Sequence, residues 1–179
     1  MNVPNLLSIS RILAGPVFMV LMLEPTPERA LWAGVVFALA SITDWFDGYY
    51  ARKWDQITKI GKLLDPLADK ILIASALIML VNIDPDIVPA WMVIIIIGRE
   101  IAVTGLRAKA ATEGIIIAAE QLGKYKVGAQ ITVVLSFVLN YRIGQEWVVV
   151  LGTAALWVSV VLALISGVQY FTAYWRRLG

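Results

Sequence analysis

Long apolar stretches separated by short polar connections constrain this sequence more than any other feature. Six stretches can be delimited, over residues 5–23, 30–52, 61–83, 88–107, 124–141 and 147–175. Each is close to the length that a helix needs to cross the hydrocarbon core of a bilayer. A spanning segment must satisfy its own backbone hydrogen bonds, so helices are expected rather than strands. The sequence therefore predicts an all-α polytopic membrane protein with six transmembrane helices and short loops.

Composition supports a single membrane domain over residues 1–179. The chain is 60% hydrophobic and 16% charged, whereas about a quarter of a soluble domain is charged. It contains neither Cys nor His, which excludes disulfides, thiolate chemistry and a histidine base. Proton transfer would fall to carboxylates. The net charge of +2 is too small to suggest nucleic-acid binding.

The distribution of basic residues predicts how the chain is oriented. Three connections, near residues 24–29, 84–87 and 142–146, carry several acidic residues but only Arg29 and Arg142. The other thirteen Lys and Arg residues lie on the opposite side or in helices that open toward it. Because basic loops remain in the cytoplasm, we expect that side and both termini to be cytoplasmic.

Four aspartates stand at helical spacing close to this cytoplasmic side: Asp44 and Asp47, then Asp65 and Asp69. Residues three or four apart share one face of a helix. Clustered carboxylates repel one another unless they are protonated or neutralised, and divalent cations with oxygen ligands do this well. Ordinary interfacial Asp–Arg pairs explain one such acid but not four. Buried carboxylates also mark ion paths, so an ion-coupled transporter is an alternative from a different class.

The spacing D-x2-D-G-x2-A-R-x8-G-x3-D-x3-D, from Asp44 to Asp69, resembles the signature of the CDP-alcohol phosphatidyltransferase family, and every fixed position matches. The resemblance implies an integral enzyme of the bacterial inner membrane whose active site faces the cytoplasm. It also implies CDP-diacylglycerol as a substrate, contact with membrane lipids and a homodimer.

The same resemblance assigns roles to individual residues. It implies two divalent metal ions, Mg²⁺ or Mn²⁺, with Asp69 also accepting the proton of the attacking hydroxyl. The metal ligands are expected to be Asp44, Asp47, Asp65 and Asp69. The residues expected to bind the CDP-lipid are Asn5, Ser8, Asp44, Gly48, Ala51, Arg52, Thr58 and Gly61. Arg52 is expected on the pyrophosphate, because its planar fork suits phosphate oxygens.

Two of these assignments have an equally good ordinary explanation. Residues 3–11, with Pro4, Asn5 and Arg11, resemble the family's short N-terminal interfacial helix, whose Asn contributes to the nucleotide and metal region. Asn5 could instead be a helix N-cap. Thr58 matches a position at which the family contacts the nucleotide, but it could equally be an ordinary loop residue.

The second half of the chain is expected to bind the acceptor alcohol. The residues expected to bind an acceptor phosphate are Arg99, Thr104, Arg107 and Lys124. Glu100, Thr104 and Arg107 are spaced to share a helix face, and charge-assisted hydrogen bonds suit a phosphate. Charges that face lipid headgroups are the alternative; this fits Lys109 and Lys126 well and fits Arg99 poorly, because Arg99 follows the apolar run 94–97.

The segments REI…LR, from Arg99, and GKxK, from Gly123, resemble the branch of the family that uses glycerol 3-phosphate. One departure is Val127, where that branch usually has Thr. The expected reaction is transfer of a phosphatidyl group from CDP-diacylglycerol to sn-glycerol 3-phosphate, giving phosphatidylglycerophosphate and CMP. Relatives that use phosphatidylglycerol, inositol phosphate or serine as acceptor remain alternatives.

Overall fold

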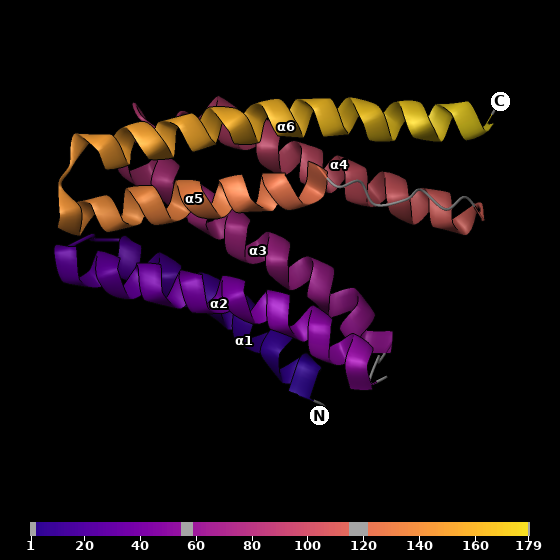
Figure 1. Ribbon diagram of the computed structural model, residues 1–179, viewed down its shortest axis with the longest axis horizontal. Helices are drawn as coiled ribbons and strands as arrows, with labels where there is room; N and C mark the ends of the chain where they lie inside the picture. Colours follow the sequence, from indigo (N-terminus) through magenta and orange to yellow (C-terminus); the bar gives the residue numbers. More distant parts are fainter. Residues whose placement is uncertain (1–2, 55–58, 115–121, 179) are drawn as a thin grey trace.

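A computed structural model describes residues 3–54, 59–114 and 122–178 (Figure 1). The described residues form six helices. These are α1 (Val3–Met22), α2 (Pro27–Trp54), α3 (Lys59–Ile83), α4 (Ala90–Thr112), α5 (Leu122–Ile143) and α6 (Glu146–Leu178). The expected all-helical fold is confirmed for this part of the chain.

Local chemistry explains where several helices begin and end. The Thr26 hydroxyl accepts the Arg29 amide at 3.2 Å and so caps α2, and proline at the first helical position suits its missing amide. Helix α5 ends at Ile143, and Gly144 follows it with a positive φ of 63°, which favours glycine. The Asn140 side chain then accepts the Gln145 amide at 3.1 Å, which closes the turn into α6.

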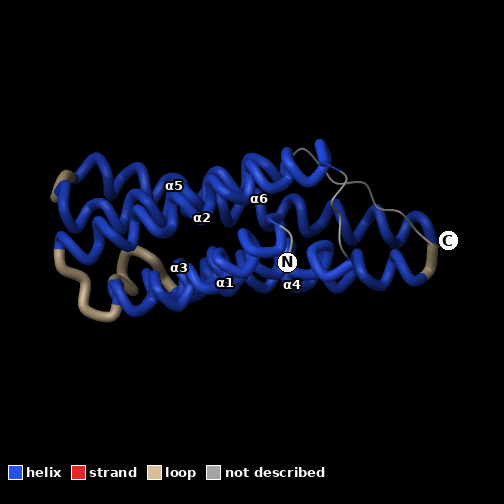
Figure 2. Tube along the Cα trace, turned by 90° about the horizontal axis from the view of Figure 1, so that it is seen from below, coloured by secondary structure: helices blue, strands red, loops and turns tan. Residues whose placement is uncertain are grey.

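The helices form two layers of three. Figure 2 separates α2, α5 and α6 from α1, α3 and α4. Within the layers α2 and α6 flank α5, and α1 and α4 flank α3; between the layers α1 contacts α2, α3 contacts α5, and α4 contacts α6. The turns after α1, α3 and α5 gather at one end of the bundle (Figure 2). This is the arrangement that the three short acidic connections predicted.

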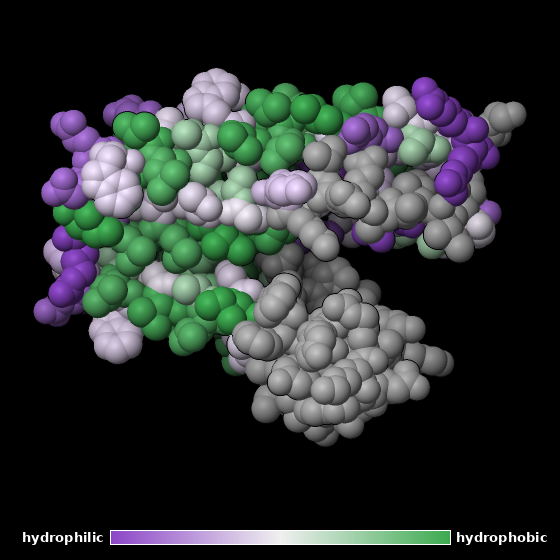
Figure 3. Space-filling model, viewed as in Figure 1, coloured by the Kyte–Doolittle hydropathy of each residue, from purple (hydrophilic) through white to green (hydrophobic). Residues whose placement is uncertain are grey.

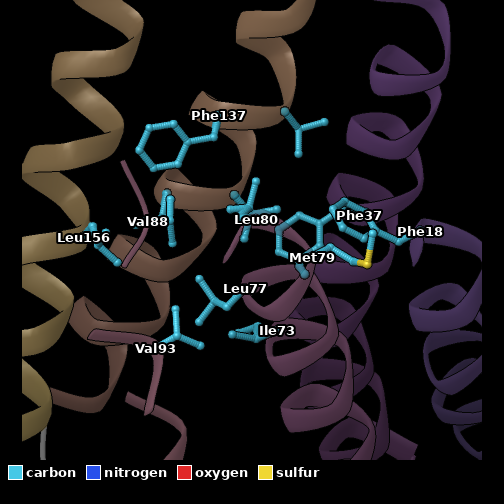
Figure 4. Packing of buried hydrophobic residues seen from close by; sticks show 14 of the residues in the cluster. Phe18, Phe37, Ile73, Leu77, Met79, Leu80, Val88, Val93, Phe137 and Leu156 are labelled. Carbon is cyan, nitrogen blue, oxygen red and sulfur yellow. The ribbon is translucent and has the colours of Figure 1, made fainter. Parts of the chain in front are cut away.

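The core runs along the middle of the bundle and draws on every helix (Figure 4). Phe18 of α1 and Phe37 of α2 are fully buried, and their ring centroids are 5.8 Å apart. Helices α5 and α6 approach closely at Gly152 of α6, where a Cβ atom would stand 2.9 Å from Cζ of Phe137 in α5. Small residues that permit such contact are a common means of packing helices in lipid, where excluding water from between them gains nothing.

The outer surface is apolar across its middle. In Figure 3 hydrophobic side chains cover the central part of the face that is drawn, and hydrophilic ones gather at its two ends. On α6, Val150, Val161 and Val168 are all about half exposed or more. Among the described residues, α6 is the helix long and apolar enough to cross a membrane, while 9–22 and 70–83 are shorter apolar segments. An apolar surface of this extent marks a region that contacts a membrane or another protein.

The fold differs from the expectation at the N-terminus and at several helix ends. The expected short interfacial helix is not separate, because residues 3–22 form one continuous helix. Pro4 lies in the first turn of that helix, where its missing amide proton breaks no hydrogen bond. Helix α4 continues to Thr112, five residues past the apolar stretch, because residues 108–112 are mainly alanine, the strongest helix former.

Candidate active site

The four aspartates lie on two helices that adjoin in sequence and touch in space. Asp44 and Asp47 belong to the last three turns of α2, and Asp65 and Asp69 to the first half of α3. Because both segments are helical, the spacings of three and four residues place each pair on one helix face. Helices α2 and α3 contact each other.

The side chains of most residues expected to bind the CDP-lipid and the metals lie outside the described part of the structure. This applies to Asn5, Ser8, Asp44, Asp47, Gly48, Ala51, Arg52, Gly61, Asp65 and Asp69, and to Lys124 on α5. Thr58 lies outside the described residues altogether. The assignments made to these residues remain predictions.

The described side chains around α4 form a buried ionic cluster next to α3. Oε1 of Glu100 accepts hydrogen bonds from Nζ of Lys126 on α5 and, at 3.2 Å, from Nη1 of Arg99. The side chains of Lys126 and Arg99 are 7% and 11% exposed, and that of Glu100 is 20% exposed. The Arg99 guanidinium also lies 5.4 Å from the ring centroid of Tyr170 on α6, within the range of a cation–π interaction. The cluster therefore ties α4 to both α5 and α6.

A second polar contact links α4 to α3. Nζ of Lys70 donates a hydrogen bond to Oγ1 of Thr104, and the Thr104 hydroxyl donates to the Glu100 carbonyl at 2.6 Å. Lys70 directly follows Asp69 in the sequence. The contact thus joins a cation of α3, the helix that carries the last two aspartates, to a hydroxyl of α4.

These groups surround a cavity of about 470 Å³ between α3, α4 and α5. Its polar lining consists of Lys70, Glu100, Thr104, Lys126 and Gln130. The remaining lining is apolar, chiefly isoleucines of α3 and α4. Two cations, one carboxylate, a hydroxyl and an amide give this otherwise apolar cavity a net positive charge, which suits a small anionic molecule that also carries polar oxygens.

The structure separates the residues that were expected to bind an acceptor phosphate. Thr104 lines the cavity. Arg99 instead lines a second pocket, of about 540 Å³, between α4 and α6, and reaches the cavity through its bond to Glu100. Arg107 is exposed on α4, one turn beyond Thr104. Of the three described residues, only Thr104 lines the cavity.

Lys70, Lys126 and Gln130 line the cavity but were not among the residues expected there. For Lys126 the alternative of a charge facing lipid headgroups, which its sequence position fits, is excluded because its side chain is buried against Glu100. A usable signal was present in the sequence, since Lys126 and Gln130 are four residues apart and so share one face of α5. Lys70 could have been noticed as the residue next to Asp69.

A further ionic contact fastens the end of α4 to the end of α6. The Tyr174 hydroxyl donates to Oε2 of Glu113 at 2.7 Å, and Nζ of Lys109 lies 2.9 Å from Oε1 of the same carboxylate. The Tyr174 hydrogen bond and then the Lys109 hydrogen bond hold the pKa of Glu113 below its ordinary value. The hydrogen bond to Glu113 raises the pKa of Lys109. Because both shifts favour the charged forms, this contact holds the polar ends of α4 and α6 together at neutral pH.

Comparison with known proteins places the chain in a familiar group. The family model described as CDP-alcohol phosphatidyltransferase matches residues 1–165. A Bacillus subtilis protein named CDP-diacylglycerol–glycerol-3-phosphate 3-phosphatidyltransferase is 44% identical over 99% of this chain and 97% of its own length. Proteins of the same name from Rickettsia bellii and Pseudomonas fluorescens are each 37% identical, over 96% and 99% of this chain and 94% and 92% of their own lengths.

Proposed function

This chain belongs to the CDP-alcohol phosphatidyltransferase family, and on that premise we propose that it transfers a phosphatidyl group from CDP-diacylglycerol to sn-glycerol 3-phosphate. The products are phosphatidylglycerophosphate and CMP. The observation that carries the choice of acceptor is the cavity lined by Lys70, Thr104 and Lys126. A neutral alcohol would gain little from two cations, whereas a phosphate dianion would form charge-assisted hydrogen bonds with both.

The reaction needs one bond exchange at phosphorus. A hydroxyl oxygen of glycerol 3-phosphate bonds to the phosphatidyl phosphorus, the bond from that phosphorus to the CMP oxygen breaks, and the hydroxyl proton passes to the Asp69 carboxylate. Asp69 suits this role because it precedes Ile73, which lines the acceptor cavity, by four residues, and residues at that spacing share one helix face. A positioned carboxylate base typically contributes about 10²–10⁴-fold to the rate.

The CDP-lipid belongs, in this proposal, to the region where α1, α2 and α3 meet. Arg52 binds the pyrophosphate, and Gly48, Ala51 and Gly61 allow the nucleotide to approach the helix backbones. Asn5, Ser8 and Thr58 complete the nucleotide contacts. Support comes from the contacts of α1 with both α2 and α3, which bring the N-terminal helix to the helices that carry the aspartates.

The four aspartates fit a pair of divalent cations, Mg²⁺ or Mn²⁺. Hard cations prefer carboxylate oxygens. Helices α2 and α3 contact each other, and each carries one pair of aspartates. Asp44, Asp47, Asp65 and Asp69 would hold the ions, which when bound would neutralise charge on the pyrophosphate and its leaving group. The acceptor phosphate, by contrast, would be bound by the protein's own cations, Lys70 and Lys126.

The same proposal places the chain in the bacterial inner membrane with six spanning helices. Its active site faces the cytoplasm, where glycerol 3-phosphate arrives from water and CDP-diacylglycerol from the bilayer. The apolar surface of α6 and the gathering of the three short connections at one end support this orientation. We expect a homodimer, for which the small residues of several helices would permit close contact.

An acceptor panel tests the proposed function. The purified protein, in detergent with CDP-diacylglycerol and Mg²⁺, should release CMP with glycerol 3-phosphate and far more slowly with serine, inositol phosphate or phosphatidylglycerol. Preference for one of those acceptors would make the protein a different member of the family. Absence of CMP release with every acceptor would favour a transporter. Removal of metal by a chelator should stop the reaction, and added Mg²⁺ or Mn²⁺ should restore it.

A further inference from the structure

Gln130 is a buried amide that the proposed reaction has not yet used. It lies on α5, is 2% exposed, and lines the cavity together with Lys126. Among the residues that the structure describes, no group accepts a hydrogen bond from its Nε2 atom. A buried donor without an acceptor is costly, so an amide retained at such a place calls for a partner that the protein itself does not supply.

The position of Gln130 specifies what kind of partner that is. Lys126 precedes it by four residues, so the ammonium and the amide project from the same face of α5 one turn apart. Helix α5 runs toward the end of the bundle where the turns after α1, α3 and α5 gather, so Gln130 lies one helical turn farther in that direction than Lys126. The side-chain acceptors of the same cavity already have donors, because Glu100 accepts from Lys126 and Thr104 accepts from Lys70. The partner is thus an oxygen atom of a bound molecule whose anionic part remains nearer the entrance.

We propose that Gln130 determines acceptor specificity by donating a hydrogen bond from Nε2 to the middle hydroxyl of a glycerol phosphate. Lys126 and Lys70 bind the phosphate, and the terminal hydroxyl remains available for attack. This inference rests on the proposed function. It goes further, because it assigns to one residue the recognition of a hydroxyl that takes no part in bond exchange.

A pair of acceptors tests the assignment. Glycerol 3-phosphate is compared with 3-hydroxypropyl phosphate, which keeps the phosphate and the terminal hydroxyl and lacks the middle one. A site built to hydrogen-bond a hydroxyl discriminates strongly against the analogue without it, so the unaltered protein should prefer glycerol 3-phosphate by at least about 10-fold in kcat/KM. Gln130→Met keeps the length and apolar bulk of the side chain and removes the donor. It should lower kcat/KM for glycerol 3-phosphate to the level of the analogue and leave the analogue within about 3-fold.

Matched variants keep the result interpretable. Gln145→Met makes the same change in the turn before α6, at the opposite end of the bundle, and should alter neither acceptor. Gln130→Leu provides a second apolar replacement if Gln130→Met does not fold. A variant that loses both acceptors equally, or neither, overturns the inference, because the first result marks a structural residue and the second an unused one.

Binding measured without turnover separates this inference from the proposed function. Thermal stabilisation of the protein by each acceptor alone should be stronger for glycerol 3-phosphate, and Gln130→Met should abolish the difference. If no acceptor supports CMP release but this difference is found, the proposed function fails and the hydroxyl contact stands. If the unaltered protein binds both molecules equally, or neither, the inference fails whatever the turnover.

Discussion

Among the charged side chains that the structure describes, we expect Glu100 to be the one whose replacement most lowers the stability of the bundle. Glu100→Gln removes the counter-charge of Lys126, whose side chain is 7% exposed, and of Arg99. Removing one partner of a buried ion pair typically costs about 3–5 kcal/mol, because an uncompensated charge remains. Glu100 itself is 20% exposed, so water will compensate part of that charge, and we expect a loss of about 2–3 kcal/mol. For a chain of this size that corresponds to a Tm lower by about 4–12 °C.

A double variant tests the reasoning behind this magnitude. Glu100→Gln with Lys126→Met removes both charges, and replacing a complete buried pair is often nearly neutral. The double variant should therefore be more stable than Glu100→Gln alone. Recovery should be incomplete, because Arg99 still loses its carboxylate partner and keeps only the Tyr170 ring. The double variant should still fail to use glycerol 3-phosphate, since Lys126 is absent from the acceptor cavity.

Intrinsic tryptophan fluorescence during heating in detergent gives the Tm of each variant. Glu24→Gln is the matched control, because Glu24 pairs with Arg29 at 3.3 Å on the exposed surface and such pairs contribute about 0–1 kcal/mol. A Glu100→Gln protein as stable as the control variant would refute the buried-pair argument. Additive losses in the double variant would also refute it, because coupled partners must show an interaction energy.

Three further variants test other parts of the account. Asp69→Asn cannot accept a proton, and kcat should fall by about 10²–10⁴-fold; near-normal turnover would remove Asp69 from the role of base. Gly152→Ala should destabilise the bundle by about 1–3 kcal/mol, because the new Cβ would stand 2.9 Å from the Phe137 ring, and an unchanged Tm would show that the ring moves aside at no cost. The pKa of Glu113 is lowered, first by the Tyr174 hydroxyl, so its contribution to stability is present above its ordinary pKa and disappears as pH falls through the folded value. The Tm advantage of the unaltered protein over Glu113→Gln should accordingly shrink toward acid pH, whereas a constant difference would contradict this assignment.

The helical fold and the order of its turns were predictable from the sequence, because both depend on local patterns. Apolar stretches long enough to span a bilayer predicted helices at the right places, and the acidic connections predicted which turns gather at one end. Helix ends were less predictable. The continuation of α4 to Thr112 depends on the helix propensity of the alanines in residues 108–112, which the length of the apolar stretch does not show.

The acceptor cavity was only partly predictable, because its composition depends on how the helices are rotated against one another. Thr104 was expected there and lines it. Helix α5 is apolar on most of its circumference, so its sequence does not reveal which face turns toward α3 and α4. The sequence of α5 therefore also fits a headgroup-facing Lys126, whereas the structure pairs it with Glu100 on another helix. The places of Lys70 and Gln130 in the cavity were not predicted either, because the sequence does not show how α3 and α5 are rotated about their axes.

The identity of the lipid product tests the central claim most directly. The purified protein would be reconstituted into vesicles that contain CDP-diacylglycerol, supplied with glycerol 3-phosphate and Mg²⁺, and the lipids analysed by mass spectrometry. The account predicts phosphatidylglycerophosphate and an equal amount of CMP. A lipid with a different headgroup, or CDP-diacylglycerol recovered unchanged while the protein remains folded, would contradict it.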